Sequence, residues 1–283
     1  MKSWNGLKRW GGWLAAAITA VGLGLPPASA LASGGVAPPK QDWTFSGVFG
    51  RFDEASLKRG AQVAVEVCMS CHSIKYIKFD HLRSFGFSEA EVKAMAESQG
   101  KTKKDKMISG MDPQAAKDSF GTIPPDLSLM TKARKGYEDY TYGILTGYLN
   151  DKEKEMVEKI FADGNVLDPE IKEAAEALHL GHDLEKAKKS LERIHRGDNF
   201  NKYFPGNFLA MPQPISAGQV TFADGKESSL EQMAKDVTSF LAWAAEPTAM
   251  ERKSAGVKVI AYLVLLTIML YAVKRRVWSR IPH

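Results

Sequence analysis

Two cysteines and a histidine stand together at Cys68-Met69-Ser70-Cys71-His72, and the chain has no other cysteine. The C-x-x-C-H spacing is the attachment pattern of a c-type haem. Its two thiols can form thioether bonds with the two vinyl groups of one porphyrin, and His72 then lies where its imidazole can ligate the iron. A thioredoxin-like redox pair or a local disulfide would use the same cysteines, but neither accounts for His72, and no βαβ pattern surrounds the motif. We therefore predict one haem c, attached through Cys68 and Cys71.

The second axial position of the iron decides what such a haem does. A methionine thioether would keep the iron six-coordinate and low-spin and would raise its potential, which suits electron transfer, whereas an open face would suit gas binding or catalysis. Met211 is the leading candidate, because it lies in a turn-rich loop with Pro212 and Pro214, which restrict the backbone. Met233 falls on the apolar stripe of a helical pattern and is expected to fill the core. Three further methionines lie in or near loops: Met107, Met111 and Met130.

Two helical patterns are expected to position the motif. The first follows Asp53, its expected N-cap, and runs into Cys68. Gly60 in its interior costs stability relative to alanine and therefore predicts a close contact with another helix. The second pattern begins with a capping box at Ser229 and ends before Pro247. We expect these two helices to cross near Gly60, in a mainly α fold whose loops enclose the haem.

Further patterns complete the outline of the haem-bearing part. The adjacent prolines Pro124 and Pro125 fix φ and exclude helix, so residues 121–128 are expected to be extended. The remaining expectations are an extended arm over 31–50, a helix over 88–98 capped by Ser88, a helix over 138–149 with Tyr148 among its apolar residues, a solvated lysine-rich loop over 101–106, and a short hairpin over 220–226.

Residues 151–197 differ from the rest of the chain. They are dense in lysine and glutamate, their only aromatic residue is Phe161, and Asp168-Pro169 restarts a helical pattern. We interpret them as a charged insertion of two or three surface helices. Its histidines could form a metal site, although solvated helix histidines are the simpler interpretation. They are His179, His182 and His195.

Residues 1–30 have the pattern of a cleaved signal peptide. Three basic residues precede a short apolar stretch, and Ala28-Ser29-Ala30 forms a small-x-small cleavage pattern. The mature chain is expected to begin near Leu31, with Ala32 as the other possible cut. The short apolar core and this ending argue against an uncleaved anchor. Export also agrees with the haem motif, because c-type haem is attached on the outer side of the membrane.

A second apolar stretch lies near the C-terminus. Residues 259–273 carry no charge, and with their flanks, 256–275, they are long enough to span a bilayer. A basic cluster and a tryptophan follow as interfacial anchors and predict a cytoplasmic tail over 276–283. Residues 31–250 would then form a haem domain on the periplasmic side, the orientation that the signal peptide also requires. A buried core helix is the alternative.

The positive net charge of +5 belongs to the two ends of the chain. Residues 31–250 contain 28 lysines and arginines against 32 aspartates and glutamates. No basic stripe is interleaved with aromatic residues, so the composition disfavours a nucleic-acid partner. An acidic body instead favours a cationic protein partner through electrostatic steering.

Segments in the same order along most of the mature chain resemble the cytochrome c1 family, the haem subunits of the cytochrome bc1 complex. The haem motif is shared by all c-type cytochromes, whereas the other segments are more specific. The matching segments are Arg59-Gly60, Cys68–Ser73, Gly121–Ser128 (GTIPPDLS), Ala133-Arg134, Glu138–Tyr140, Leu145–Tyr148, Tyr203–Gly206 (YFPG), Lys235–Val237, Phe240-Leu241 and Trp243–Pro247 (WAAEP). The insertion at 151–197 departs from the family, and family disulfides of such regions cannot form here.

The resemblance implies a cytochrome c-like haem domain with one C-terminal transmembrane helix. It identifies Met211 as the second axial ligand of the iron. It also implies that Arg134 and Tyr140 lie near the haem propionates, and that Pro124 and Pro125 pack against the haem.

The function implied by the resemblance is one-electron transfer within ubiquinol–cytochrome c reductase. Electrons would pass from the Rieske iron–sulfur protein to a soluble or membrane-bound c-type cytochrome, with cytochrome b and membrane lipid as further partners, at a bacterial-type inner membrane. The enzyme is the assembly, and this subunit would supply no catalytic acid, base or nucleophile. An independent membrane-anchored electron-transfer cytochrome is the alternative within that class. A haem-based gas sensor or a peroxidase would instead need an open sixth position.

Overall fold

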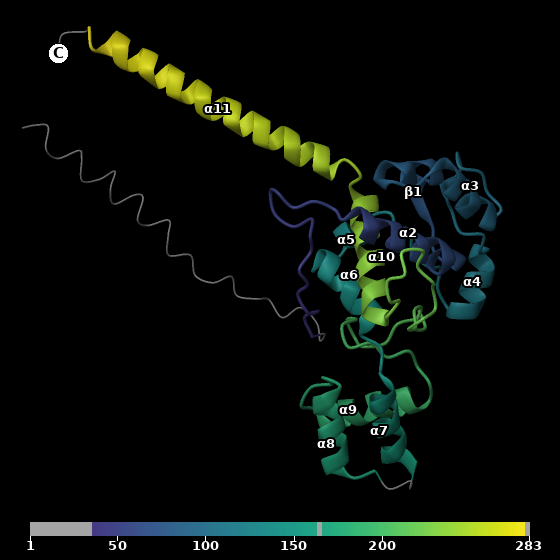
Figure 1. Cartoon of the computed structure of the whole chain (residues 1–283). Coiled ribbons are helices and arrows are strands. Elements are labelled where there is room, and N and C mark those ends of the chain that lie inside the picture. Colours follow the sequence, from purple (N-terminus) through teal and green to yellow (C-terminus); the bar gives the residue numbers. More distant parts are fainter. Residues whose placement is uncertain (1–35, 163–165, 281–283) are drawn as a thin grey trace, which may run out of the picture. The chain divides into compact units, whose positions relative to one another are not determined.

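The computed structural model describes residues 36–162 and 166–280 (Figure 1). The predicted signal peptide over 1–30 and its cleavage site lie outside the described residues. Within them the chain is mainly helical, as predicted, with one two-stranded antiparallel sheet. In chain order the elements are α2 (Glu54–Glu66), the 3₁₀ helix η1 (Cys68–Ser70), β1 (Ile74–Lys78), the 3₁₀ helix η2 (Phe79–Phe85), α3 (Glu89–Ser98), β2 (Lys106–Met107), α4 (Pro113–Phe120), α5 (Met130–Ala133), α6 (Tyr137–Thr146), α7 (Asp151–Ala162), α8 (Asp168–Ala177), α9 (Leu184–His195), α10 (Leu230–Ala245) and α11 (Ala249–Trp278).

Helices α2 and α10 cross at a glycine (Figure 1). A Cβ atom on Gly60 of α2 would lie 2.0 Å from the carbonyl oxygen of Asp236 and 2.8 Å from the Cβ of Phe240, both in α10. Only glycine allows so close an approach. The predicted crossing near Gly60 is therefore confirmed. The predicted N-cap is confirmed as well, because the Asp53 carboxylate accepts the backbone N–H of Ser56 at 3.0 Å.

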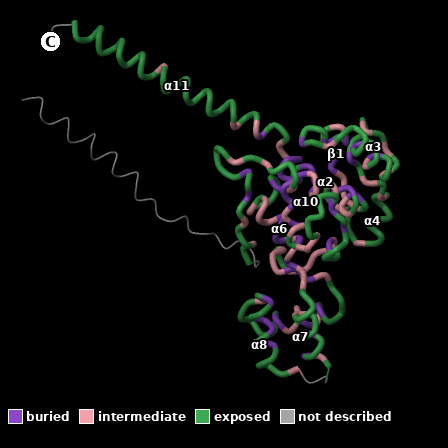
Figure 2. Tube along the Cα trace, in the orientation of Figure 1, coloured by how far each residue is buried: buried purple, intermediate pink, exposed green. Residues whose placement is uncertain are grey.

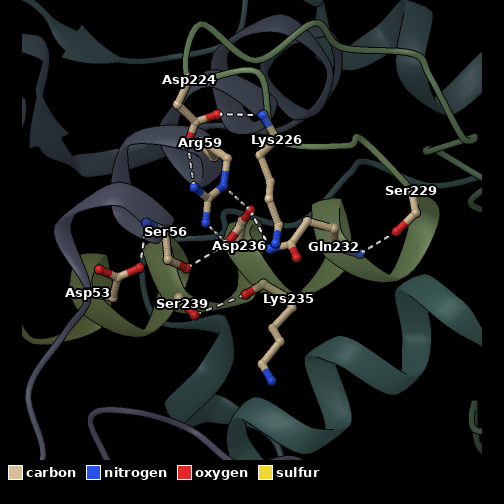
Figure 3. Close-up of polar contacts among 10 residues, drawn as sticks. All are labelled: Asp53, Ser56, Arg59, Asp224, Lys226, Ser229, Gln232, Lys235, Asp236 and Ser239. Atoms are coloured by element: carbon tan, nitrogen blue, oxygen red, sulfur yellow. Dashed lines mark hydrogen bonds and ion pairs between the residues drawn. The ribbon is translucent and has the colours of Figure 1, made fainter.

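A buried carboxylate joins the two helices beside this crossing (Figure 3). Asp236 of α10 is 1% exposed and accepts hydrogen bonds from Arg59 Nε at 2.6 Å, Ser56 Oγ at 2.6 Å and Gln232 Nε2 at 2.9 Å. Arg59 also donates to Asp224 at 2.6 Å, which attaches the loop before α10. A shift of α2 along α10 would separate Asp236 from Arg59 and Ser56, and a buried charge without partners costs several kcal/mol. The network therefore fixes the register of the two helices.

The larger apolar core lies around the inner faces of α2 and α10, which Figure 2 shows as buried. Phe85 meets Trp243 edge to face with ring centroids 4.7 Å apart, and Phe240 stacks on the same indole at 5.7 Å. Met233 is fully buried in this core, as predicted. Because buried side chains of both helices belong to this core, it holds α2, and therefore the haem motif at its end, against α10.

Helix α6 is shorter than predicted. It ends at Thr146 and not near 149, because Gly147 leaves the helix to pack against the chain after the insertion. A Cβ atom on Gly147 would lie 2.6 Å from Asn201 Oδ1, and the Gly147 carbonyl accepts the backbone N–H of Lys202 at 2.9 Å. The other two local predictions are confirmed: Ser88 caps α3 in a capping box, and residues 121–128 contain no helix.

The predicted hairpin over 220–226 is wrong. Val220 and Phe222 are buried, and Gly225 closes a turn on the carbonyl of Phe222 at 3.1 Å, but no strands form there. The alternation of apolar residues reflects two side chains that anchor a loop in the core. The strands pair elsewhere, through Ile74 and Met107, so the end of the segment predicted as a lysine-rich loop is a strand.

The insertion forms three helices, α7 to α9, around an apolar cluster of their own. Leu167, one residue before the predicted start, occupies the N-cap position of α8. The three histidines are exposed, and His195 stacks on Phe161 and lies 3.4 Å from a carboxylate oxygen of Glu158. The buried members of the cluster are Val157, Ile160, Ile171, Ala174, Ala175, Leu178, Ala187, Leu191, Ile194 and Phe200.

Helix α11 has 30 residues and is long and apolar enough to cross a membrane. It extends the predicted span of 256–275 at both ends. Its apolar side chains are exposed, which contradicts the alternative of a buried core helix. At its start, Glu246 pairs with Lys132 of α5 and accepts from Arg252 Nε at 2.5 Å.

Candidate haem-binding site

The C-x-x-C-H motif forms a tight turn at the end of α2. The helix ends at Glu66, and residues Cys68 to Ser70 continue as one turn of 3₁₀ helix. The backbone N–H groups of Cys71 and His72 both donate to the carbonyl of Cys68, at 3.1 Å and 2.8 Å. The two cysteines are not joined in a disulfide. The long helix α2, fixed against α10, therefore determines where both thiols lie.

The ring of His72 is oriented by the proline segment. Its Nδ1 lies 2.7 Å from the carbonyl oxygen of Pro125, and because a carbonyl only accepts, Nδ1 carries the proton. In the neutral ring, Nε2 is then unprotonated and can bind a metal, the arrangement found in most histidine ligands. Burial lowers the pKa of His72, which favours the neutral imidazole that a metal requires.

The proline segment is itself fixed to the chain after the motif. Leu127 donates its backbone N–H to the carbonyl of Ser73 at 2.8 Å, and the Asp126 carboxylate accepts the N–H of Lys75 at 3.1 Å. Ser128 Oγ accepts the N–H of Tyr76 at 3.2 Å. These contacts place Pro124 and Pro125 beside the haem motif although more than fifty residues separate them in the chain.

All eight residues predicted for the haem site line one cavity of about 580 Å³. This volume lies within the range of roughly 300–1,000 Å³ typical of ligand pockets. The remaining lining is largely apolar and comes from α2, α6, α10 and the loops around them. The eight residues are Cys68, Cys71, His72, Pro124, Pro125, Arg134, Tyr140 and Met211.

The cavity narrows the choice among the methionines. Of the described methionines, Met130 and Met211 line it, whereas Met107 and Met233 are fully buried in the core. Met130 also packs against the larger core. Met211 thus remains the methionine in a loop on the cavity wall.

Comparison of the sequence with known protein families shows which family this chain belongs to. Residues 43–281 match the Cytochrome C1 family. The chain belongs to the cytochrome c1 family. The cytochrome c1 of Rhodospirillum rubrum is 36% identical over 268 residues, which cover 88% of this chain and 90% of that protein.

Two further relatives are mitochondrial. The cytochrome b-c1 complex catalytic subunit of Candida albicans is 34% identical over 266 residues, covering 88% of this chain and 80% of that protein. The cytochrome c1 heme protein of Saccharomyces cerevisiae is 34% identical over 264 residues, covering 87% of this chain and 74% of that protein. Cytochrome c1 proteins are electron-transfer subunits with a covalently attached c-type haem.

The residues present fit the haem of the cytochrome c1 family. The cavity joins a pair of cysteines, a histidine whose Nε2 is free, and a methionine in one apolar space. Burial raises the pKa of the Cys68 thiol to about 12. A redox-active C-x-x-C thiol needs a lowered pKa, so this environment disfavours the thioredoxin-like alternative.

Two polar residues, Arg134 and Tyr140, belong to the lining of this cavity. Arg134 is exposed, and among the residues that the structure describes it forms no ion pair with a carboxylate. Tyr140 is half-buried, and desolvation raises its pKa against an opposing effect of the Arg134 charge. A cation and a phenol hydroxyl in the lining of one cavity are suited to binding carboxylates such as the propionates of the haem in cytochrome c1 proteins.

Tyr148 is a site residue that the sequence analysis missed. Its hydroxyl donates to the carbonyl of Met211 at 2.9 Å and lies 3.3 Å from the carbonyl of Pro212. Asn199 Nδ2 adds a contact with the carbonyl of Ala210 at 3.3 Å. The sequence analysis placed Tyr148 among apolar helix residues. The sequence does carry one indication of this role. Tyr148 directly follows Gly147, where a helix is expected to end, so its hydroxyl is available to bind a neighbouring loop.

Proposed function

We propose that this chain is the haem-bearing, electron-transferring subunit of a ubiquinol–cytochrome c reductase. The observation that carries the proposal is the hydrogen bond between His72 Nδ1 and the Pro125 carbonyl, which leaves Nε2 for iron in a cavity also lined by Met211. Family membership supports the same role.

Four residues would hold the haem. Cys68 and Cys71 would form the thioethers, and His72 Nε2 and Met211 Sδ would be the axial ligands. A haem with these two ligands supplies one-electron oxidation and reduction without binding a substrate at iron. Arg134 and Tyr140 would bind the propionates, and Pro124 and Pro125 would pack against the ring.

The protein would position the two iron ligands and exclude water from the iron. Tyr148 fixes the backbone of the Met211 loop, and Pro125 fixes the ring of His72. The apolar lining keeps water from the iron and thereby helps to set the potential. None of these steps requires a side chain that transfers a proton, so we assign no acid, base or nucleophile to this chain.

The proposed partners follow from the family. The Candida relative is named as a subunit of a cytochrome b-c1 complex, which supports cytochrome b as a neighbour of α11. The Rieske iron–sulfur protein would deliver the electron, and a soluble or membrane-bound c-type cytochrome would accept it. The acidic composition of 31–250 suits a cationic acceptor.

The proposed topology places the haem domain, residues 31–250, in the periplasm of a bacterial-type inner membrane. The basic residues at the end of α11 support a cytoplasmic tail over 276–283, since positive charges accumulate on the cytoplasmic side. They are Lys274, Arg275 and Arg276. The signal peptide over 1–30 would direct the export that this orientation needs. The insertion, residues 151–197, forms part of the exported domain.

Purification in mild detergent tests the assignment to a complex. We expect the haem-containing chain to co-purify with a cytochrome b and a Rieske protein, and ubiquinol to reduce its haem within that preparation. Purification of the chain alone would favour the independent anchored cytochrome. Carbon monoxide binding to the reduced native protein would favour a gas sensor and would count against Met211 as a ligand.

A further inference from the structure

The turn over residues 46–50 presents two large apolar side chains to the outside. Phe49 is 83% exposed and Val48 is 60% exposed, whereas Trp43 and Phe45 in the same segment are each only 9% exposed. Val48 and Phe49 are adjacent, so their exposed side chains form one apolar surface. This exposure indicates that something other than this chain's core covers the surface.

Val48 and Phe49 are exposed because they form the tip of a turn whose backbone is fixed by hydrogen bonds and by two glycines. The backbone N–H of Ser46 donates to the carbonyl of Trp43, and that of Arg51 donates to the carbonyl of Thr44, both at 2.9 Å. Gly47 has φ +72°, which favours glycine, and a Cβ atom on Gly50 would lie 1.9 Å from the Ser46 carbonyl oxygen. The backbone therefore holds the tip, Val48 and Phe49, in one outward position.

The turn is attached to the start of the membrane-spanning helix. Lys253 of α11 donates through Nζ to the carbonyls of Phe45, at 2.5 Å, and Gly50, at 3.3 Å. Both ends of the turn are thus bound to a single side chain. In Figure 1 the purple segment that leads into α2 passes beside the start of α11, in agreement with these contacts.

The attachment point lies at the level of the membrane interface. Val257, four residues after Lys253, begins the run of exposed apolar side chains of α11. Four residues of α-helix rise about 6 Å. With α11 spanning the membrane, a turn fixed at Lys253 would lie within the layer of lipid headgroups, where aromatic side chains and cations are enriched in membrane proteins.

From these contacts we infer that the tip of this turn, Val48 and Phe49, inserts into the lipid bilayer interface beside α11 as a second membrane contact. Arg51, exposed at the end of the turn, lies where it can meet lipid phosphates. A helix alone leaves the attached domain free to rotate about the helix axis. A second contact at the interface would fix which face of the haem domain turns toward the membrane. The inference depends on α11 spanning the membrane and not on the chemistry of the haem.

An environment-sensitive fluorophore tests the insertion. Phe49→Cys is labelled with a nitrobenzoxadiazole maleimide in the purified complex, which is then placed in nanodiscs of phosphatidylcholine and phosphatidylglycerol. The chain's own cysteines belong to the haem motif, and the complex without the introduced cysteine gives the background from other subunits. Leu184→Cys is the matched control, because Leu184 is an exposed apolar residue at the start of α9, in the insertion. The haem spectrum of each variant confirms that the domain is folded.

Lipid contact gives a distinct pattern of quenching. We expect the label at 49 to emit at shorter wavelength than the label at 184, to be quenched by lipids with a nitroxide near the headgroup, and to be protected from aqueous iodide. An emission like that at 184, quenched by iodide, would overturn the inference, because the turn would lie in water. A short-wavelength emission that neither quencher affects would also overturn it, because another subunit would then cover the turn.

Discussion

At the scale of single residues, one hydrogen bond decides which nitrogen of His72 can bind iron. The Pro125 carbonyl fixes the proton on Nδ1, and the prolines hold that carbonyl in place because their own φ angles are fixed. The hydroxyl of Tyr148 in turn donates a hydrogen bond to the backbone carbonyl of Met211, the proposed second ligand. Both ligands are therefore held by contacts to backbone carbonyls.

Replacement of each methionine in turn shows which of the two that line the cavity is the ligand. We expect Met211→Leu to lower the midpoint potential by on the order of 0.1 V or more, within the range of roughly 0.8 V that axial ligands cover. The reduced variant should also bind carbon monoxide. Met130→Leu is the control and should change neither property. Redox titration and carbon monoxide difference spectra measure both, and the opposite result for the two variants would assign the ligand to Met130.

Removal of one hydroxyl tests the support of the Met211 loop. Tyr148→Phe should leave the haem attached but lower the temperature at which the low-spin spectrum is lost. The hydrogen bond contributes about 1 kcal/mol, and the carbonyls left without it add to the cost. Tyr76→Phe, on an exposed tyrosine of β1, should have no such effect. Equal thermal transitions in the two variants would show that Tyr148 does not hold the loop.

At the scale of elements, the crossing of α2 and α10 positions the haem motif. The helices meet through a glycine, and the Asp236 network joins residues that lie 177 to 180 positions apart in the chain. The motif begins two residues after α2 ends, so any displacement of α2 moves both cysteines. The crossing is therefore expected to determine how efficiently the haem is attached.

A single added methyl group tests the crossing. Gly60→Ala would place a Cβ atom 2.0 Å from the Asp236 carbonyl oxygen, so the helices must separate. We expect a loss of about 1–3 kcal/mol in the free energy of unfolding, with less haem attached per chain. Gly110→Ala is the matched control, since no atom lies within 4 Å of its Cβ position. Haem staining on a denaturing gel and thermal unfolding measure the outcome, and normal haem content in Gly60→Ala would refute the claim.

Arg59 pairs with two carboxylates, Asp236 and Asp224, and replacing each in turn tests what the ion-pair network contributes to stability. Asp236 is buried, whereas the side chain of Asp224 is 44% exposed. We expect Asp236→Ala to cost about 3–5 kcal/mol, because it leaves a largely buried cation with one partner fewer. Asp224→Ala should cost much less stability than Asp236→Ala, because exposed ion pairs contribute little. Thermal unfolding compares the two variants, and similar losses would mean that burial of Asp236 is not what matters.

At the scale of the whole molecule, the described chain contains two apolar clusters and one exposed apolar helix. The larger cluster contributes to the haem cavity, the smaller one lies among the three helices of the insertion together with Phe200, and α11 has the length and composition of a membrane span. The insertion thus carries its own core, which explains how 47 residues can be added between α6 and the Met211 loop without a disulfide.

The haem attachment and the local structure around it could be predicted from the sequence, because both depend on short local patterns. The C-x-x-C-H motif, the caps at Asp53 and Ser88 and the double proline each act within a few residues. Tyr148 and Asp236 could not be assigned, because their roles depend on partners 63 to 180 residues away. The hairpin over 220–226 failed for a related reason, since Phe222 alternates with polar residues to reach the core and not to pair with a strand.

The coordination of the iron tests the account most directly. The electron paramagnetic resonance spectrum of the oxidised protein, recorded in its native complex, distinguishes a six-coordinate low-spin iron from a five-coordinate high-spin one. With His72 and Met211 as ligands, we expect a low-spin spectrum and no high-spin signal. A five-coordinate, high-spin iron in the native protein would contradict the central claim that this chain carries electrons through a closed haem.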